Sequence, residues 1–375
     1  MRFNCRACGI ENNETAAFIL HKSPLSAQGF SIKPNKKSCN MRIYQCSHCM
    51  VIQHIDKPVS YYKDVIRAVS FSQKMKDFRK KFLKLWLSKY DLNSKKILEI
   101  GCGSGEYLEM LKTAGAKKIF GIENNKNNID SCLRQKFQIK KGYLEKNFNN
   151  PWKQKFDAFT IFSFMEHWPN PIDSISSLHN ILSEGAIGLI EVPNFDLIIE
   201  KGLYTEFTPD HIFYFNKSTL KLFLESKGFD ILSIKVIWQK YIISAVVKKR
   251  SKLSLKNFYN VKEKLESKLH RFIDNSNHKT VIWGAGHQSL AVISVSNISS
   301  KIKYIVDSAT FKQNKYTPAS ALLVKDPKYL LEDRPYSIII MAAAYSDEIL
   351  KIIRTNYSFI NKIAILREND LEIIN

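Results

Sequence analysis

The stretch Glu99-Ile100-Gly101-Cys102-Gly103-Ser104-Gly105 decides how this chain of 375 residues folds. Its first two residues complete the run Lys96-Ile97-Leu98-Glu99-Ile100, which is typical of a buried strand, and a helical pattern follows the glycines. Alternate glycines let the backbone turn sharply and approach a ligand closely. A strand, a glycine loop and a helix in this order predict a parallel sheet that is covered by helices on both faces.

Strands and helices continue to alternate after this loop. Apolar runs at residues 118–123, 156–164 and 186–192 predict further strands of the same sheet. The first of these runs ends in an acid, Glu123, at the position where ribose hydroxyls would be bound. We therefore expect an α/β fold with a central Rossmann-like domain over residues 61–249.

A second unit of the same kind follows. The run Val281-Ile282-Trp283 leads into Gly284-Ala285-Gly286, and three more apolar runs follow it. Before it, residues 252–273 have the periodicity of a charged helix. These patterns predict a helical connector over residues 250–278 and a smaller Rossmann-like α/β domain over residues 279–375.

The N-terminal segment is rich in cysteine. Cys5-Arg6-Ala7-Cys8 and Cys46-Ser47-His48-Cys49 are two C-x-x-C knuckles, which together supply the four thiolates that Zn²⁺ prefers at a structural site. We predict a small zinc-binding domain over residues 1–60. A disulfide is disfavoured in the cytoplasm, and a redox pair lacks its strand–CxxC–helix context. The predicted metal ligands are Cys5, Cys8, Cys46 and Cys49, and the further candidates are Cys39, His48 and His54.

Composition limits the partners of the chain. The formal net charge is +22, but the lysines are scattered instead of clustered with aromatic residues, so we expect no nucleic-acid partner. No apolar run approaches the 18 or so residues of a membrane helix, and the N-terminus is polar, so we expect a cytoplasmic protein with no membrane insertion. The oligomeric state is not predicted.

The glycine loop carries a resemblance. Residues 99–105 resemble motif I of the class I S-adenosylmethionine-dependent methyltransferases, and residues 156–167 resemble the fourth-strand motif of that family. In the family, the loop glycines contact the methionine part of the cofactor, and the acid after the second strand binds the ribose. The resemblance implies S-adenosylmethionine as the cofactor. The residues that it implies for binding are Glu99, Gly101, Cys102, Gly103, Gly105, Glu123, Phe162 and Ser163.

The layout of the whole chain resembles a narrower group, the sugar nucleotide C-methyltransferases. These enzymes join a zinc domain that contains C-R-x-C-G to a methyltransferase domain and a C-terminal domain that begins with G-A, as do residues 5–9 and 284–285 here. The family segment Y-H-E-H-x-x-Y-F appears as Thr-Pro-Asp-His-Ile-Phe-Tyr-Phe at residues 208–215. This departure leaves open the identity of the sugar and whether carbon, oxygen or nitrogen accepts the methyl group.

The resemblance implies methylation of a nucleotide-linked 4-keto sugar through an enolate. We predict His211 as the base, because the pKa of histidine lies near working pH. Asp210 supplies an adjacent charge, and His167 is a second acid/base or enolate-stabilising group. The alternatives are a capping or packing role for His211, and a ring of His167 that packs over the cofactor.

Two other classes of function remain as alternatives. The C-terminal glycine loop, followed by Asp307, resembles a dinucleotide fingerprint and would suit an NAD-binding oxidoreductase, although Ser289 replaces its third glycine. The other alternative is a zinc module that recruits a partner beside a degenerate cofactor fold. The intact loop and Glu123 argue against degeneration.

Overall fold

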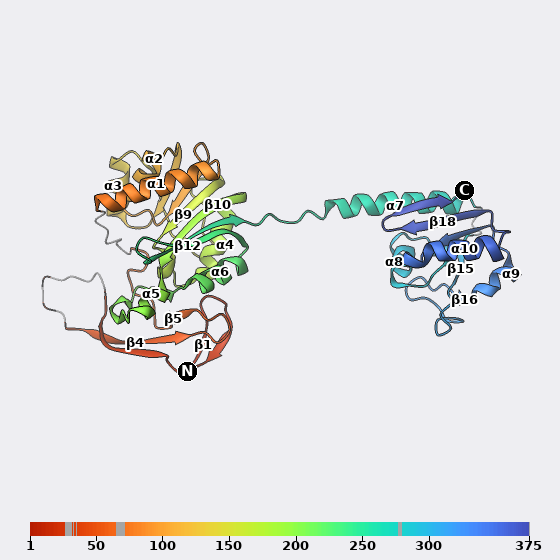
Figure 1. Ribbon diagram of the computed structural model, residues 1–375, viewed down its shortest axis with the longest axis horizontal. Coiled ribbons are helices and arrows are strands. Elements are labelled where there is room, and N and C mark those ends of the chain that lie inside the picture. Colours follow the sequence, from red (N-terminus) through yellow and green to blue (C-terminus); the bar gives the residue numbers. More distant parts are fainter. Residues whose placement is uncertain (27–31, 33, 35, 65–71, 277–279, 375) are drawn as a thin grey trace. The chain divides into compact units, whose positions relative to one another are not determined.

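The computed structural model describes residues 1–26, 32, 34, 36–64, 72–276 and 280–374. These residues fall into two compact units, Met1–Lys252 and Leu253–Asn375 (Figure 1). Within the described ranges, no helix has both the length and the apolar composition needed to span a bilayer.

The first unit is built around a seven-stranded sheet with the order β12-β13-β10-β9-β6-β7-β8 among the described residues. Its central strands are parallel, and β12 and β13 join them in antiparallel pairing. The strands are β6 (Lys96–Ile100), β7 (Lys118–Glu123), β8 (Gln138–Lys141), β9 (Phe156–Phe162), β10 (Leu182–Pro193), β12 (Phe229–Ile237) and β13 (Ile242–Lys249).

The sequence predicts β6 and β7 correctly, and one prediction about β9 is wrong. The apolar run continues to residue 164, but the strand stops at Phe162. Ser163 adopts a positive φ of 45°, which turns the chain out of the sheet at this point.

Helices cover both faces of this sheet. Apolar side chains of α1, α2 and α3 pack on one face, and those of α4 and α6 pack on the other. The helices of the unit, including short 3₁₀ turns, are α1 (Gln73–Lys89), α2 (Glu106–Thr113), α3 (Lys126–Arg134), η1 (Met165–His167), α4 (Pro171–Ile181), α5 (Phe195–Glu200), η2 (Tyr204–Glu206) and α6 (Lys217–Ser226).

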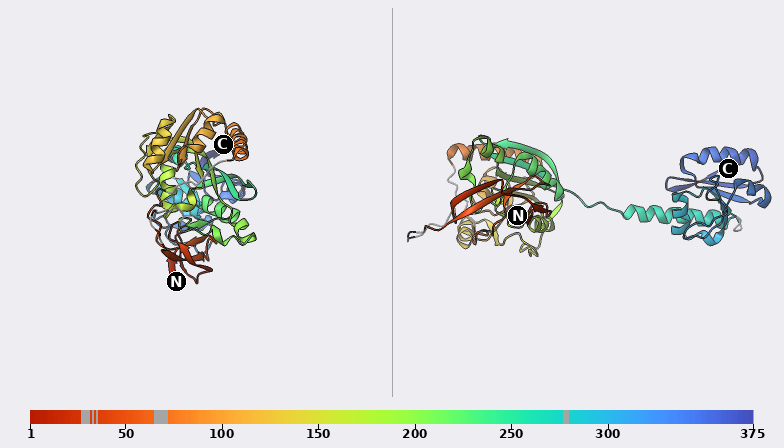
Figure 2. Two further views of the ribbon diagram at one scale, coloured as in Figure 1. Left: turned by 90° about the vertical axis from the view of Figure 1, so that its left-hand side faces the viewer. Right: turned by 90° about the horizontal axis from the view of Figure 1, so that it is seen from below.

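The N-terminal strands form what we call the cysteine module, β1 to β5. One two-stranded sheet carries the first knuckle, and a hairpin lies between the two knuckles. In Figures 1 and 2 these strands, in red and orange-red, lie at the end of the unit opposite α1, α2 and α3. The strands are β1 (Arg2–Asn4), β2 (Glu11–Asn13), β3 (Phe18–Pro24), β4 (Ser38–Gln45) and β5 (Ile52–His54).

A strand from much later in the chain completes the module. β11 (Phe213–Tyr214) pairs antiparallel with β5, which gives a four-stranded sheet of order β11-β5-β4-β3. Cys5 and Cys46 also belong to the same apolar cluster as the α4 face of the large sheet. The module is therefore packed against the rest of the first unit.

The second unit holds a six-stranded sheet of order β16-β15-β14-β17-β18-β19 among its described residues, all parallel except β19. Its strands are β14 (Thr280–Trp283), β15 (Ile302–Val306), β16 (Val324–Lys325), β17 (Ser337–Ile340), β18 (Lys362–Arg367) and β19 (Asp370–Ile374). Its helices are α7 (Lys256–Asp274), α8 (His287–Val295), η3 (Ser299–Lys301), η4 (Pro327–Tyr329), α9 (Leu330–Asp333), η5 (Ala343–Tyr345) and α10 (Ser346–Asn356).

The helix that the sequence predicts as a connector contributes to this second core. Leu269 and Ile273 of α7 are completely buried and pack in one cluster with Ile282 of β14. The last turns of α7 are therefore part of the second unit.

Candidate functional site

The glycine loop lies at the carboxyl end of β6, where the helices that follow two neighbouring strands pack on opposite faces of the large sheet. The helix after β6 covers one face and the helix after β9 covers the other, although β6 and β9 are neighbours. Such a switch point leaves a crevice at the carboxyl ends of the strands, where α/β proteins bind ligands. The loop after β6 and the residues after β9 lie at these carboxyl ends.

Each glycine of the loop has a backbone conformation that favours glycine. The φ angles of Gly101, Gly103 and Gly105 are 68°, 58° and 98°. A Cβ atom at Gly101 would lie 2.6 Å from the ring of Phe164, and one at Gly105 would lie 3.1 Å from Sγ of Cys132. The loop therefore leaves no room for a side chain at Gly101 or Gly105; we call this loop the glycine cradle.

Glu123 ends β7 beside this cradle. Its Oε2 accepts a hydrogen bond from the Gly103 N–H at 2.9 Å, and its Oε1 accepts one from the Asn125 N–H at 2.9 Å. The side chain is mostly buried, and this burial raises the pKa of the carboxyl above its ordinary value. Each carboxylate oxygen can still accept further bonds, as a ribose diol requires.

The other predicted cofactor residues lie at the same edge, but several side chains point into the protein. Glu99, Cys102 and Phe162 are completely buried. The Phe162 ring stacks on the Tyr107 ring at 4.1 Å between centroids. Ser163 donates its N–H to the Glu191 carbonyl, which fixes the turn after β9.

The predicted histidines come together next to this edge. The rings of His167 and His211 lie 4.7 Å apart between centroids, at 73°, and the Phe164 ring lies 6.4 Å from His167. Nδ1 of His167 lies 2.7 Å from the carbonyl oxygen of Asp210, so Nδ1–H donates this bond and Nε2 carries the lone pair. The Asp210 carboxylate lies 3.9 Å from the same Nδ1.

The surroundings of His211 favour its neutral form. Burial lowers the pKa of the imidazole below its usual value, and the nearby Asp210 carboxylate opposes this shift. Tyr214, three residues after His211, packs beside it. Its side chain is buried, and its hydroxyl oxygen accepts a hydrogen bond from the Thr208 N–H. A neutral imidazole has a lone pair that can accept a proton.

Backbone pairing holds the His211 segment between the cysteine module and η1. Ile212 donates its N–H to the Glu166 carbonyl at 2.8 Å, and its own carbonyl accepts from the His54 N–H at 3.2 Å. Phe213 then pairs with Gln53 in the β11–β5 ladder. The position of His211 therefore depends on β5.

The four predicted cysteines form one cluster. Their Sγ atoms lie within 4.8 Å of one another, with Cys5–Cys49 at 3.6 Å and Cys8–Cys46 at 3.8 Å. Tetrahedral zinc with Zn–S bonds of about 2.3 Å sets sulfur separations of about 3.8 Å. No cysteine is in a disulfide, all seven being in the described ranges. The residues thus fit a structural zinc ion, and Cys39, His48 and His54 lie outside the cluster.

Gln53 connects this cluster to the His211 segment. Its Nε2 donates to Sγ of Cys5 at 3.0 Å, and its Oε1 accepts from the Arg6 N–H at 3.0 Å. Because Gln53 also pairs with Phe213, one residue touches both the predicted metal site and the strand after His211.

Sequence reasoning missed four buried residues near the site. Arg79 of α1 and Glu191 of β10 form an ion pair at 2.7 Å. The sequence signal was an acid inside the apolar run of β10. Glu166 is 1% exposed. It lies in residues 156–167, the segment that resembles the fourth-strand motif, so the sequence could have singled it out. The hydroxyl of Tyr143 is buried without a hydrogen-bond partner among the described residues, and its ring contacts Phe164.

The second glycine loop has the same strand context but a different acid environment. Oδ2 of Asp307 accepts from the Ala285 N–H at 2.7 Å and lies 3.0 Å from Nζ of Lys312, and Oδ1 accepts from the Ala309 N–H. Burial alone would raise the pKa of Asp307. The backbone N–H donors and Lys312 outweigh burial, so the pKa is lowered. A ribose diol at Asp307 would have to displace an ammonium group, which disfavours the NAD alternative.

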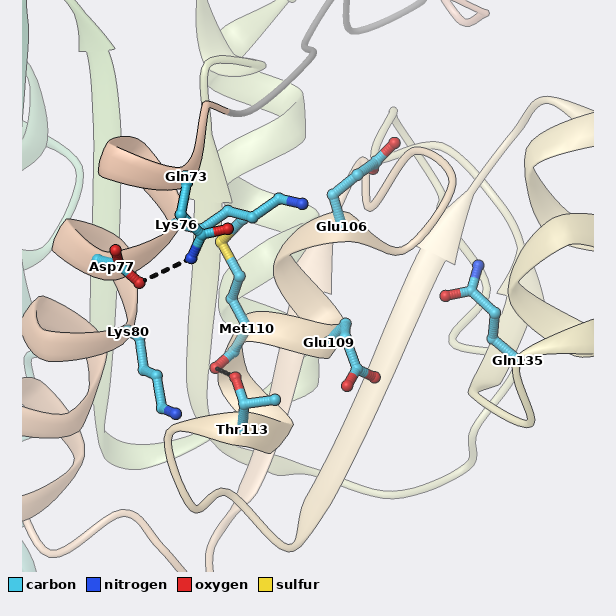
Figure 3. Close-up of a pocket in the computed structure, with 9 residues that line it drawn as sticks. All are labelled: Gln73, Lys76, Asp77, Lys80, Glu106, Glu109, Met110, Thr113 and Gln135. Carbon is cyan, nitrogen blue, oxygen red and sulfur yellow. Dashed lines mark hydrogen bonds between the residues drawn. The ribbon is translucent and has the colours of Figure 1, made fainter.

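A cavity of about 510 Å³ lies between α1 and α2 (Figure 3). It borders the first glycine loop, because Glu106 directly follows Gly105 and Gln135 donates to the Ser104 carbonyl. Charged and polar side chains line most of it, and Gln73 donates to Asp77 across one wall. None of the predicted site residues contributes to it. The lining residues are Gln73, Lys76, Asp77, Lys80, Glu106, Glu109, Met110, Thr113 and Gln135.

Family comparisons agree with the geometry at the first glycine loop. Residues 71–234 match the family described as a methyltransferase domain. Residues 71–234 form a methyltransferase domain of the S-adenosylmethionine-dependent class. Residues 251–362 match a second family, described as a C-methyltransferase C-terminal domain.

Curated relatives match part of this chain. A mitochondrial ubiquinone biosynthesis O-methyltransferase of Dictyostelium discoideum is 32% identical over 112 residues, or 26% of this chain and 35% of that protein. A tRNA U34 carboxymethyltransferase of Campylobacter hominis is 27% identical over 99 residues, or 25% of this chain and 35% of that protein. The chain thus spans about a third of the length of these relatives.

Among solved structures, the magnesium protoporphyrin IX methyltransferase of Synechocystis PCC 6803, with bound S-adenosylhomocysteine, is 14% identical. The alignment covers 50% of this chain and 96% of that chain, with a TM-score of 0.39. The assignment of the methyltransferase domain rests on the sequence matches.

Proposed function

We propose that the chain transfers a methyl group from S-adenosylmethionine to a carbon beside the ketone of a nucleotide-linked sugar. The observation that carries this proposal is the pair of histidine rings at the carboxyl edge of β9, next to the glycine cradle. The match of residues 251–362 to a C-methyltransferase C-terminal domain supports carbon as the acceptor. The cytoplasm is the proposed location.

The chain would hold the cofactor with the residues of the first switch point. Gly101, Gly103 and Gly105 allow close backbone approach, and Glu123 offers its remaining lone pairs to the ribose hydroxyls. When bound, the cofactor supplies a methyl group that the sulfonium already activates for transfer. The protein then has to hold the acceptor in line and remove one proton.

His211 would remove that proton. Nε2 or Nδ1 of its neutral ring takes the proton from the carbon beside the ketone, and the electron pair of the broken C–H bond passes into the enolate. The enolate carbon would then form the new bond to the methyl carbon as the bond between that carbon and sulfur breaks; the electron pair of the broken bond stays on sulfur, and S-adenosylhomocysteine leaves. His167, oriented by the carbonyl of Asp210 at 2.7 Å, presents the Nε2 lone pair, so it would exchange a proton, and it would stabilise the enolate oxygen once Nε2 is protonated.

The test is a methyl-transfer assay with the full chain across nucleotide-linked 4-keto sugars, with mass spectrometry to locate the new methyl group. Methyl on carbon supports the proposal. Methyl on oxygen or nitrogen gives the alternative methyltransferase, and NAD(H) binding without S-adenosylhomocysteine binding overturns both.

A variant isolates the predicted base. His211→Gln should lower turnover by about 10²- to 10⁴-fold, because it removes the proton acceptor, and should leave S-adenosylhomocysteine affinity unchanged. Unchanged turnover with the true acceptor would remove His211 from the mechanism.

A further inference from the structure

A second group of metal-ligating side chains lies in the first unit, apart from the four cysteines. Glu166, His167 and His211 offer a carboxylate oxygen and two ring nitrogens within 4.8 Å of one another. We call these three residues the His–Glu cluster. Within the described ranges, the cysteine cluster is the other group of this kind.

The donor set suits a borderline transition-metal ion. Two imidazoles and one carboxylate bind Zn²⁺ at sites that keep a fourth position open. Zn–N and Zn–O bonds of about 2.0–2.1 Å in a tetrahedron set ligand separations of about 3.4 Å. The three ligand atoms lie within 4.8 Å of one another, so metal binding would draw them together by up to about 1.4 Å. Mg²⁺ prefers oxygen ligands and is not expected here.

The neighbours of His167 already orient it as a ligand. Its Nδ1–H donates to the Asp210 carbonyl at 2.7 Å, so Nε2 carries the lone pair. A metal-binding histidine commonly donates its other N–H to a carbonyl or carboxylate, which fixes its tautomer and ring orientation. The Asp210 carboxylate at 3.9 Å adds negative charge next to the same ring.

Backbone contacts place the ligands on fixed elements. Glu166 and His167 lie in η1, and the Glu166 carbonyl accepts from Ile212, the residue after His211. Glu166 and His167 are 1% and 4% exposed, so the ion would lie below the surface. Such pre-organisation lowers the entropic cost of metal binding.

We propose that the His–Glu cluster is a second transition-metal site, which binds Zn²⁺ and inhibits methyl transfer reversibly. The inhibitory consequence rests on the proposed function: a metal ion on the lone pair of His211 leaves no base for the acceptor. The binding itself does not depend on that function, since the donor set and its geometry are present in the protein.

Binding is tested with the full chain that already contains one zinc ion per chain. Co²⁺ is added, and the visible spectrum is recorded. A nitrogen–oxygen site gives weak d–d bands, whereas cobalt on thiolates also gives intense near-ultraviolet charge-transfer bands. We expect one equivalent of Co²⁺ to bind and to give only the weak d–d bands. Zn²⁺ should displace this cobalt, and Mg²⁺ should not.

Three variants locate that equivalent. His167→Ala, His211→Gln and the near-isosteric Glu166→Gln should each weaken binding by about 10-fold or more. His287→Ala, which removes an exposed histidine of the second unit, is the matched control and should change nothing. Near-ultraviolet circular dichroism and S-adenosylhomocysteine binding verify that each variant is folded.

The outcomes separate this inference from the proposed function. Absence of a further equivalent, or one that persists in all three variants, overturns the inference even if methyl transfer is found. A further equivalent that the variants remove supports the site even if no acceptor is methylated. With an active preparation, added Zn²⁺ should inhibit methyl transfer, and a chelator should restore turnover to the level of the one-zinc protein. Methyl transfer that is unaffected at saturating Zn²⁺ overturns the inhibitory role.

Discussion

The guanidinium of Arg79 and the carboxylate of Glu191 form an ion pair at 2.7 Å, and each side chain is 1% exposed. The pair joins α1 to β10 beneath the carboxyl edge of the sheet. The guanidinium carbon also lies 5.3 Å and 5.8 Å from the ring centroids of Tyr107 and Phe162. This one contact therefore fixes the helix against the strands that carry both the glycine loop and the turn after β9.

Removal of one partner of this pair should destabilise the first unit strongly. Arg79→Met leaves the Glu191 carboxylate buried without its cation, and we expect a loss of about 3–5 kcal/mol in the free energy of unfolding. Urea unfolding measures it. The double variant Arg79→Met, Glu191→Leu should regain most of the loss, because no unpaired charge remains.

The exposed pair Arg250–Asp230 is the matched control, since its side chains are 47% and 54% exposed. Arg250→Met should change the free energy of unfolding by less than about 1 kcal/mol. Equal effects of Arg79→Met and Arg250→Met would contradict a structural role for the buried pair.

Substitution in the two glycine loops should give opposite results. Gly101 has a φ of 68°, and a Cβ there would lie 2.6 Å from Phe164, so Gly101→Ala should distort the loop and weaken S-adenosylhomocysteine binding. Gly286 has a φ of −83° and no atom within 4 Å of a Cβ, so Gly286→Ala should be tolerated. Isothermal titration calorimetry compares the two; equal affinities would place the cofactor elsewhere.

Glu123 and Asp307 form a second matched pair of acids. Glu123→Gln removes charge-assisted hydrogen bonds that the ribose hydroxyls would make, and about 1.5–3 kcal/mol corresponds to about 10- to 100-fold weaker S-adenosylhomocysteine binding. Asp307→Asn should leave that affinity at the wild-type value, because Asp307 belongs to the second unit. The prediction fails if both variants bind equally well.

The local sequence was enough to predict the elements that carry the glycine loops. β6 and β7 begin and end where the apolar runs do, because each is a short run bounded by polar residues. The knuckle spacing likewise predicted a cysteine cluster, since two residues between cysteines force both thiolates onto one turn. These features depend on residues that are close in sequence.

The contacts that complete the site depend on residues far apart in sequence, and no local pattern specifies them. Arg79 lies in a helix rich in lysine, where a charged residue is usually solvated, and its partner Glu191 is more than a hundred positions away. Phe213 and its partner Gln53 are even farther apart in sequence, and the two residues of β11 are too few to show strand periodicity. The sequence therefore predicted His211 as a candidate but could not predict what holds it.

Loss of the predicted zinc ion should loosen the His211 segment. Gln53 contacts Sγ of Cys5 and pairs with Phe213, so disorder in the cluster reaches β11. Cys46→Ser should remove one thiolate ligand, lower zinc content below one per chain and increase amide hydrogen exchange in residues 52–54 and 212–214.

Cys39→Ser is the control for that experiment, because Cys39 lies outside the cluster. It should retain one zinc ion per chain and wild-type exchange rates, as measured by metal analysis and mass spectrometry. Zinc lost equally from both variants would contradict the proposed ligand set.

His54 should make the first unit less stable in mild acid. Its ring is 2% exposed, and burial lowers its pKa to about 4, with Asp56 opposing the shift. The unfolded chain has the ordinary pKa of about 6.5, so below that pH it binds a proton that the folded chain does not. Stability is therefore flat above the ordinary pKa and falls towards the lowered one, by roughly 2 kcal/mol between about pH 7 and about pH 5. Urea unfolding of wild type and His54→Phe at each pH measures this fall in the free energy of unfolding. Zinc release in acid lowers the stability of both proteins, so the difference between them isolates His54. Parallel pH profiles would show that the His54 ring takes up its proton in the folded state.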